Sequence, residues 1–233
     1  YEITPAVNKK KVMIAGGASS RMTPFDWCYH CVIGRLSSSQ NDPEKVVRPF
    51  DADRSGEVYG EGAAAFILED RRHAEARGAK ILGRILGASS TCEKYNGSMS
   101  GASLRRAIRQ AMAEAGVPPE DLGHVNAHGT STVLNDRAEA IAIGRVFGSS
   151  SPPVTATKGV TGHLIGGSGA VETIATLLAC RERVVPPVAG LTELDGEIDL
   201  DVVHGDQRSV KLSTAVSNSF AFGGHNASLV VSA

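Results

Sequence analysis

Cysteine, aromatic residues and long apolar segments are all scarce in this sequence. Only 4 of the 233 residues are cysteine, and aromatic residues make up 5% of the chain. So few cysteines in a chain of this length do not form a disulfide framework, which favours a reducing, cytoplasmic setting. No apolar run approaches the roughly 20 residues that a membrane-spanning helix needs, and no signal peptide is visible. We therefore expect a globular protein that does not insert into a membrane.

An excess of either charge is also missing. The chain has 24 Lys and Arg residues against 25 Asp and Glu residues, which gives a net charge of −1. This balance gives no electrostatic reason to expect binding to nucleic acid or to an anionic membrane. The one short basic run, from Lys9 to Lys11, is interpreted as a solvated loop. With 42% hydrophobic residues, the chain is able to bury a sizeable core.

Two of the cysteines form a Cys-x-x-Cys pattern, at Cys28 and Cys31, with His30 between them. A zinc or redox site of this type needs a second pair of ligands or a neighbouring βαβ unit, and neither accompanies the pattern. Ordinary packing is therefore favoured over a zinc or redox function, and no metal site is expected.

Strand-like and helix-like segments alternate along the chain, which predicts an α/β fold with an at least partly parallel sheet. The segment 103–115 shows the clearest helical period, and Gly116 follows as its stop. The apolar segment 12–17 is expected to be a buried strand because a glycine pair ends it. The other predicted strands are 63–68, 81–86, 125–127, 154–156, 213–217 and 227–231, and the other predicted helices are 69–78, 136–147 and 169–181.

Two histidines and a lysine lie at the edges of small-residue turns. His128 follows a short strand and precedes Gly-Thr-Ser-Thr, and Lys158 and His163 lie in Thr-Lys-Gly-Val-Thr-Gly-His. Glycine, serine and threonine let the backbone approach a ligand closely and leave N–H groups free to face it. These residues together indicate an acid/base and anion-binding site.

Five motifs, in this order along the chain, resemble the β-ketoacyl-acyl carrier protein synthases, most closely the elongating ketosynthases of type II fatty acid and polyketide assembly. They begin with Arg-Pro-Phe-Asp-Ala-Asp-Arg-Ser-Gly at 48–56 and Gly-Glu-Gly-Ala at 60–63. The others are Asn-Ala-His-Gly-Thr-Ser-Thr at 126–132, Thr-Lys-Gly-Val-Thr-Gly-His at 157–163, and Ser-Asn-Ser-Phe-Ala-Phe-Gly-Gly at 217–224. The likeness covers nearly the whole chain and corresponds to the C-terminal two-thirds of a ketosynthase.

The resemblance implies a thiolase-like five-layer αβαβα fold, incomplete here at the N-terminus, made of two similar α/β halves. On this basis residues 1–80 are the end of the N-terminal half and residues 81–233 are the C-terminal half. It also implies a homodimer and acyl carrier protein, loaded with acyl or malonyl groups, as the partner. No cofactor is implied, since decarboxylation itself drives the reaction.

The implied reaction is a decarboxylative Claisen condensation between an acyl-thioester held on a cysteine and malonyl-acyl carrier protein. Loss of CO2 leaves an enolate, so hydrogen-bond donors must lie where its negative charge develops. His128 and His163 stand at the matching positions of the family. A neutral imidazole donates one N–H, and two of them are able to hold one oxyanion.

The resemblance also implies roles for residues around the histidines. Lys158 matches the active-site lysine, and Glu139 matches the carboxylate expected to pair with that lysine. Asp136 is expected to cap the helix that follows His128. The residues expected to bind substrate are Thr130, Thr132, Phe220, Phe222 and Gly223, with Phe222 supplying a backbone N–H to the acyl oxyanion hole and a ring that gates the pocket.

Three features depart from the family pattern. No turn in the chain matches the one that carries the nucleophilic cysteine, which is therefore expected upstream of Tyr1. The stretch 92–101 is shorter than the family's loop and lacks its His- and Thr-containing turn. His225 and Ala221 replace the usual threonine and glycine of the last motif.

Two other functions are alternatives to a condensing enzyme. A non-catalytic partner subunit of a ketosynthase heterodimer, or an inactive fragment of one, would have no chemical need to keep His128, Lys158 and His163 together. A thiolase acting on coenzyme A thioesters would carry a second cysteine near the C-terminus, where this chain has Phe222-Gly-Gly-His-Asn. The enzyme is favoured, with the partner subunit or inactive fragment as the alternative.

Overall fold

A five-stranded mixed sheet forms the centre of the computed structural model, which describes residues 11–39, 43–93, 101–148 and 151–233, with the side chain of Phe222 left out. The strand order is β3-β9-β8-β4-β5. β3, β9 and β8 are antiparallel neighbours, whereas β8, β4 and β5 are parallel. The strands span Arg84–Cys92 (β3), His124–Asn126 (β4), Val154–Thr155 (β5), Thr214–Phe220 (β8) and His225–Ser232 (β9).

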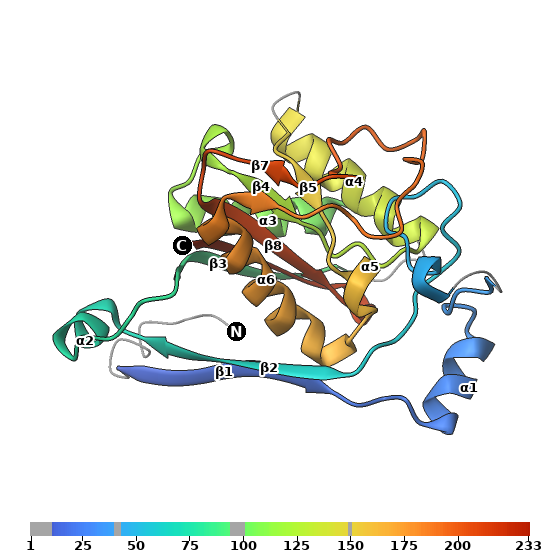
Figure 1. Ribbon diagram of the computed structural model, residues 1–233, viewed down its shortest axis with the longest axis horizontal. Coiled ribbons are helices and arrows are strands. Elements are labelled where there is room, and N and C mark those ends of the chain that lie inside the picture. Colours follow the sequence, from blue (N-terminus) through green and yellow to red (C-terminus); the bar gives the residue numbers. More distant parts are fainter. Residues whose placement is uncertain (1–10, 40–42, 94–100, 149–150) are drawn as a thin grey trace.

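Helices cover both faces of this sheet (Figure 1). Val216 and Val230 belong to the main apolar core, which includes Ile108 of α3 (Ala102–Ala115) and Ile143 of α4 (Val133–Phe147). The neighbouring residue Ala215 instead packs with Cys180 of α6 (Ser168–Glu182). Because successive strand residues point to opposite faces, α3 and α4 lie on one face and α6 on the other.

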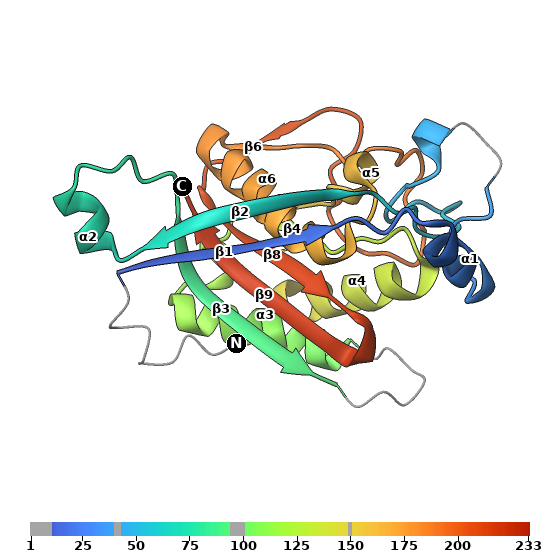
Figure 2. The ribbon, with the colours of Figure 1, turned by 90° about the horizontal axis from the view of Figure 1, so that it is seen from below.

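A long antiparallel pair of strands, β1 (Val12–Ser19) and β2 (Gly62–Glu69), lies on the far side of α6 (Figure 2). α6 is thus held between the central sheet and this pair. The segment 12–17 does form a strand, as predicted, but its predicted burial is wrong. Ile14 is 73% exposed and Ile67, directly opposite it, is 61% exposed, because the described chain covers only one face of the pair.

The helix that follows His128 begins three residues earlier than predicted. Thr132 caps it, with its hydroxyl accepting a hydrogen bond from the backbone N–H of Asn135 at 3.4 Å. Asp136 therefore is not the cap. Its buried carboxylate accepts the N–H of Phe50 at 3.0 Å and faces Arg54 at 3.4 Å, so it fastens the 48–56 motif to α4.

The remaining elements are short. α1 (Pro24–Val32) carries the exposed Cys28 and Cys31, and α2 (Arg71–Ala76) follows β2. The others are α5 (Lys158–Thr161), β6 (Val184–Val185), β7 (Arg208–Ser209) and the single turns η2 (Pro43–Lys45), η3 (Pro119–Asp121), η5 (Ile165–Gly167) and η6 (Phe222–Gly224).

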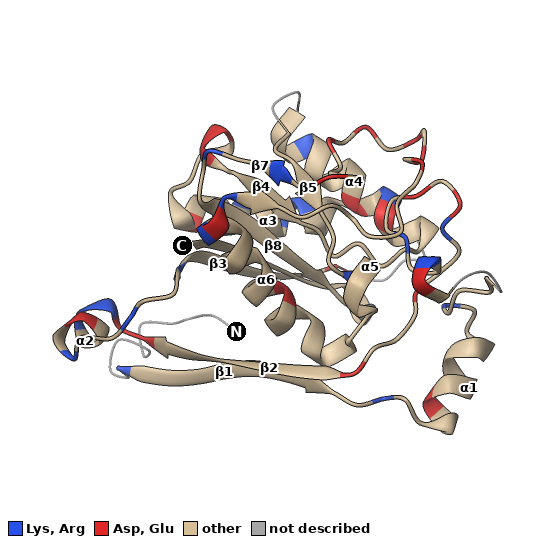
Figure 3. Cartoon of the chain, in the orientation of Figure 1, with Lys and Arg blue, Asp and Glu red and all other residues tan. Residues whose placement is uncertain are grey.

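Charged side chains are spread over the helices and loops, and β1 and β2 carry few of them (Figure 3). Within the described ranges, no helix has the length and apolar character that crossing a membrane requires.

The topology of the central sheet brings several candidate site residues together at one of its edges. β8, β4 and β5 are parallel, so Phe220, His128 and Lys158, which end or follow these strands, meet at the same edge.

Candidate active site

His128 lies in a tight turn between β4 and α4, and the buried carboxylate of Glu139 holds this turn in place. Gly129 has a φ of 41°, and a Cβ there would lie 2.6 Å from the Cβ of Ala156. Glu139 accepts the backbone N–H groups of His128 and Gly129 at 2.8 and 2.9 Å, and the side-chain amide of Asn218 at 3.3 Å. Burial raises the pKa of Glu139 to about 7, against the opposing effect of the two backbone donors.

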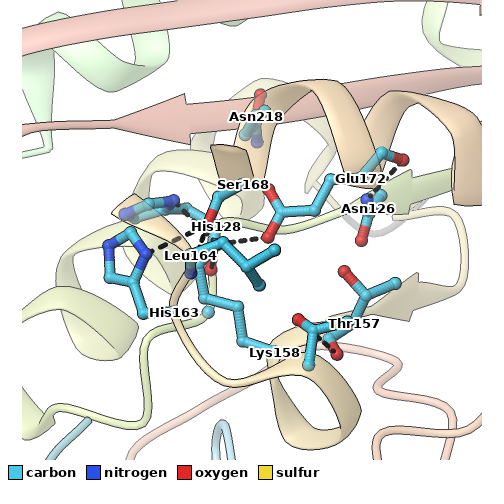
Figure 4. Close-up of polar contacts among 12 residues, drawn as sticks. Asn126, His128, Thr157, Lys158, His163, Leu164, Ser168, Glu172 and Asn218 are labelled. Carbon is cyan, nitrogen blue, oxygen red and sulfur yellow. Dashed lines mark hydrogen bonds and ion pairs between the residues drawn. The ribbon is translucent and has the colours of Figure 1, made fainter. Parts of the chain in front are cut away.

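Lys158 uses all three of its N–H donors on buried partners (Figure 4). Its Nζ lies 3.1 Å from Nδ1 of His128 and 2.6 Å from the carbonyl oxygen of His128. The third partner is the carboxylate of Glu172, on α6, in a short charge-assisted hydrogen bond. Burial raises the pKa of Glu172, and the ammonium of Lys158 opposes that rise.

The expectation that Glu139 pairs with Lys158 is therefore wrong. The carboxylate oxygens of Glu139 accept hydrogen bonds from the turn of His128, whereas Glu172 forms the ion pair with Lys158. Glu172 was not predicted as a site residue because the segment 169–181 is largely apolar. A glutamate within such a helix was the available signal, since burying a carboxylate is costly unless it is paired.

His163 is fixed by a second set of contacts, just after α5. Its Nδ1 accepts hydrogen bonds from the N–H of Ile165 at 3.1 Å and from the hydroxyl of Ser168 at 3.0 Å. That hydroxyl in turn accepts the N–H of Leu164 at 2.9 Å. Because Nδ1 accepts the Ile165 N–H it carries no proton, so the hydroxyl proton of Ser168 is directed to it. A neutral His163 must therefore carry its proton on Nε2. Ser168 was not singled out from the sequence.

The two imidazoles lie face to edge, with ring centroids 5.3 Å apart and planes at 83°. The ammonium of Lys158 donates to Nδ1 of His128, so this ring also carries its proton on Nε2. Burial, together with the charge of Lys158, lowers the pKa of His163 to about 3 and holds that of His128 well below its usual value. Both rings are therefore neutral near pH 7 and each offers one Nε2–H donor.

The predicted substrate-binding residues differ in their placement relative to the two histidines. Phe220, at the end of β8, is buried with its ring centroid 5.6 Å from that of His128. The hydroxyls of Thr130 and Thr132 lie 2.9 Å apart, and that of Thr132 also caps α4. Gly223 lies in the turn η6 with a φ of 77°. The expected gating role of Phe222 falls on a side chain outside the described part of the structure.

The four cysteines lie on α1, β3 and α6. Cys28 and Cys31 are exposed on α1, Cys180 is buried between α6 and the sheet, and Cys92 lies at the end of β3. The thiol of Cys92 is directed to the carbonyl oxygen of Gly223 at 3.6 Å. Among the described residues, no group of three or more His, Cys, Asp and Glu side chains is arranged to hold a metal ion.

The solved structures that resemble this chain include ketosynthases. One is the structure described as a type II PKS acyl-carrier protein in complex with its ketosynthase bound to the hexaketide, with a TM-score of 0.92, 30% identity, and coverage of 97% of this chain and 57% of that one. A β-ketoacyl synthase from Burkholderia phymatum has a TM-score of 0.92 at 35% identity, covering 97% and 56% of the two chains. The expected thiolase-like α/β fold is confirmed, and the class is that of the ketosynthases.

Family models match the sequence in two successive parts. Residues 7–74 match the N-terminal domain and residues 82–192 the C-terminal domain of beta-ketoacyl synthase. The chain therefore belongs to the β-ketoacyl synthase family, and the resemblance based on its motifs is confirmed.

A curated relative is 3-oxoacyl-(acyl-carrier-protein) synthase 2 of Synechocystis sp., which is 43% identical over 224 residues, 94% of this chain and 54% of the relative. The chain thus spans about half the length of the curated relatives that it matches, which is less than the two-thirds expected from its motifs.

Proposed function

We propose that the protein to which this chain belongs catalyses a decarboxylative Claisen condensation between an acyl-thioester and malonyl-acyl carrier protein, in fatty acid or polyketide elongation. The observation that carries the proposal is the buried pair His128 and His163, with both neutral rings protonated on Nε2. In this proposal residues 1–80 are the end of the N-terminal half of a ketosynthase, and residues 81–233 are its C-terminal half.

In the proposed first step the malonyl C–C bond to the carboxylate breaks and CO2 leaves. The electron pair moves into an enolate whose oxygen accepts hydrogen bonds from Nε2–H of His128 and His163. Preorganised donors of this kind stabilise developing charge more effectively than water does, because they need no reorganisation during the reaction. Lys158 acts through His128, by fixing its tautomer, and Glu172 balances the charge of that lysine.

In the second step the enolate carbon attacks the carbonyl carbon of the acyl-thioester, and the cysteine thiolate leaves as the new C–C bond forms. We propose that this cysteine lies in the part of the family's length that precedes Tyr1. Within the described ranges no hydrogen bond joins Cys28, Cys31, Cys92 or Cys180 to the side chains of His128, Lys158 or His163, which supports this view. Phe220 and the turn at Phe222 and Gly223 are proposed to line the acyl site, with Thr130 and Thr132 nearby.

Acyl carrier protein is the proposed partner, and a homodimer in the cytoplasm is the proposed state of the protein. The first proposal is supported by the related ketosynthase described in complex with its acyl-carrier protein. The location is supported by four free cysteines. The assembled His128, Lys158 and His163 cluster also favours an enzyme over a non-catalytic partner subunit, because such a subunit has no chemical use for it.

The test uses the full-length protein with acyl- and malonyl-acyl carrier protein. We expect release of CO2, formation of the 3-oxoacyl product, and a mass gain of one acyl group when the acyl donor alone is supplied. A protein that gains no acyl group and releases no CO2 would contradict the proposal.

A further inference from the structure

A chain of three buried polar side chains lies beside His163 and takes no part in the proposed reaction. The hydroxyl of Tyr59 donates to Oε1 of Glu57 at 3.0 Å, and its oxygen lies 2.7 Å from Nδ1 of His30. The three residues are 4%, 2% and 4% exposed, respectively. His30 comes from α1, whereas Glu57 and Tyr59 come from the segment before β2.

The backbone places this chain against the histidine pair. The N–H of His163 donates to the carbonyl of Val58 at 2.7 Å, and the N–H of Gly60 donates to the carbonyl of His163 at 3.0 Å. The ring of Tyr59 therefore lies next to His163, with centroids 6.3 Å apart, and the ring of His30 follows at 4.4 Å. The row of neighbouring rings that begins at Phe220 and His128 thus continues beyond His163 to Tyr59 and His30. We call the side chains of Glu57, Tyr59 and His30 the polar wall.

The charges support the same placement. Burial raises the pKa of Glu57, and the Tyr59 hydroxyl, Arg35 and Lys158 oppose that rise.

The direction of the hydrogen bonds fixes what His30 is able to bind. Tyr59 has one hydroxyl proton, and it is directed to Glu57, so the tyrosine oxygen must accept from Nδ1–H of His30. In the neutral ring Nε2 is then an acceptor. This nitrogen is buried and has no hydrogen-bond partner within the described ranges. A buried acceptor without a donor is costly, which makes the atom a place for a donor from a ligand.

We infer that the chain Glu57–Tyr59–His30 selects acyl substrates that carry a hydroxyl group, which donates a hydrogen bond to Nε2 of His30. The inference rests on the proposed function, because it extends the acyl site of that reaction to His30, beyond the residues Phe220 and Gly223 proposed above. A saturated acyl chain leaves Nε2 unpaired and brings methylene groups against a polar wall. Sites built to bind a hydroxyl discriminate strongly against analogues that lack it.

The experiment measures kcat/KM of the full-length protein for the acyl carrier protein thioesters of octanoate and of octanoates hydroxylated on the third, fifth or seventh carbon. We expect at least one hydroxyoctanoyl substrate to be preferred over octanoyl by about tenfold or more. His30→Phe is expected to lower this preference by about tenfold. Tyr59→Phe, which keeps the ring and removes the central hydroxyl, should lower it in the same direction and serves if His30→Phe does not fold.

The matched control is Tyr29→Phe, because Tyr29 is exposed on the same helix and its ring contacts His30 outside the hydrogen-bonded chain. It should leave the substrate preference unchanged. Equal use of octanoyl and every hydroxyoctanoyl substrate by the wild type would overturn the inference, as would an equal loss on all substrates in both variants. If the wild type also fails to release CO2 from malonyl-acyl carrier protein, the proposed function has failed as well, and the two failures are thereby distinguished.

Discussion

At the scale of single residues, the ammonium of Lys158 sets the state of the ring beside it. Its contact with Nδ1 of His128 places the imidazole proton on Nε2, and its charge adds to the effect of burial, which lowers the pKa of His128 and of His163. The same ammonium neutralises the buried Glu172. Lys158 thus has a structural role, the ion pair with Glu172, and a chemical role, the control of the His128 ring. The two roles are separable by mutation.

Replacing Lys158 by Met should lower both stability and activity. Breaking a buried ion pair leaves an uncompensated charge and costs about 3–5 kcal/mol, so Lys158→Met should lower the free energy of unfolding by about that amount. Adding Glu172→Gln removes the stranded carboxylate and should restore most of the stability. Decarboxylation should remain impaired in both, because His128 has lost its donor at Nδ1. Urea unfolding and CO2 release measure the two effects.

The double variant separates the structural role of Lys158 from its chemical role. If Lys158→Met combined with Glu172→Gln regained the rate as well as the stability, the contact between Lys158 and His128 would have no chemical role.

The residue types of the site could be predicted, but the pairing of its charges could not. Both histidines and the lysine were found from small-residue turns at strand ends. Which carboxylate meets Lys158 depends on where α6 crosses the site, and Glu139 and Glu172 are both buried glutamates within helices. Only the tertiary packing distinguishes them.

At the scale of elements, the turn between α5 and His163 aligns one donor of the pair. Gly162 has a φ of 66° and a ψ of −172°, a backbone conformation that is essentially confined to glycine. A Cβ at this position would lie 3.0 Å from the carbonyl oxygen of Val58, which accepts the N–H of His163. The turn and the segment before β2 therefore hold His163 through the backbone.

Gly162→Ala should lower the free energy of unfolding by about 1–3 kcal/mol from the backbone conformation alone. It should also reduce the rate of decarboxylation, because relief of the contact with Val58 moves His163. The matched control is Gly196→Ala, since a Cβ at Gly196 would meet no atom within 4 Å. Chemical unfolding and CO2 release of both variants provide the comparison. A stable and fully active Gly162→Ala protein would show that the turn does not align the histidine.

Elements with a strong periodic pattern could be predicted closely. The predicted helix 103–115 is observed at Ala102–Ala115, and 169–181 at Ser168–Glu182. The start of α4 was missed because Thr132 and Asp136 are both good capping residues, and the choice depends on Asp136 being used by Phe50 and Arg54. Likewise, no local pattern tells whether an apolar strand such as β1 is covered on one face or on both.

At the scale of the whole molecule, burial of neutral histidines predicts a fall in stability at acid pH. His124 is fully buried in β4, and burial lowers its pKa to about 4, from 6.5 in the unfolded chain. Between these two values the unfolded state binds more protons than the folded state. The free energy of unfolding therefore falls as the pH falls through that window, and the loss levels off below about pH 4.

His124→Phe should reduce this pH dependence by about 1 kcal/mol per pH unit between about pH 6 and about pH 4.5. The remaining slope should come from groups such as His128 and His163, whose pKa values are also lowered by burial. Urea unfolding at a series of pH values measures the slope of the free energy of unfolding against pH. The larger ring of phenylalanine changes that free energy by the same amount at every pH, so it does not affect the slope. An identical slope in the variant and the wild type would show that His124 is not buried as a neutral ring.

The measurement that tests the central claim most directly is the rate at which the full-length His163→Ala protein decarboxylates malonyl-acyl carrier protein. Removal of one oxyanion donor typically costs about 100- to 1000-fold in rate. We therefore predict a loss of that size, with acylation of the protein by an acyl donor retained. The exposed His204→Ala serves as the control and should change neither step. Intact decarboxylation in His163→Ala, or a loss confined to acylation, would contradict the account.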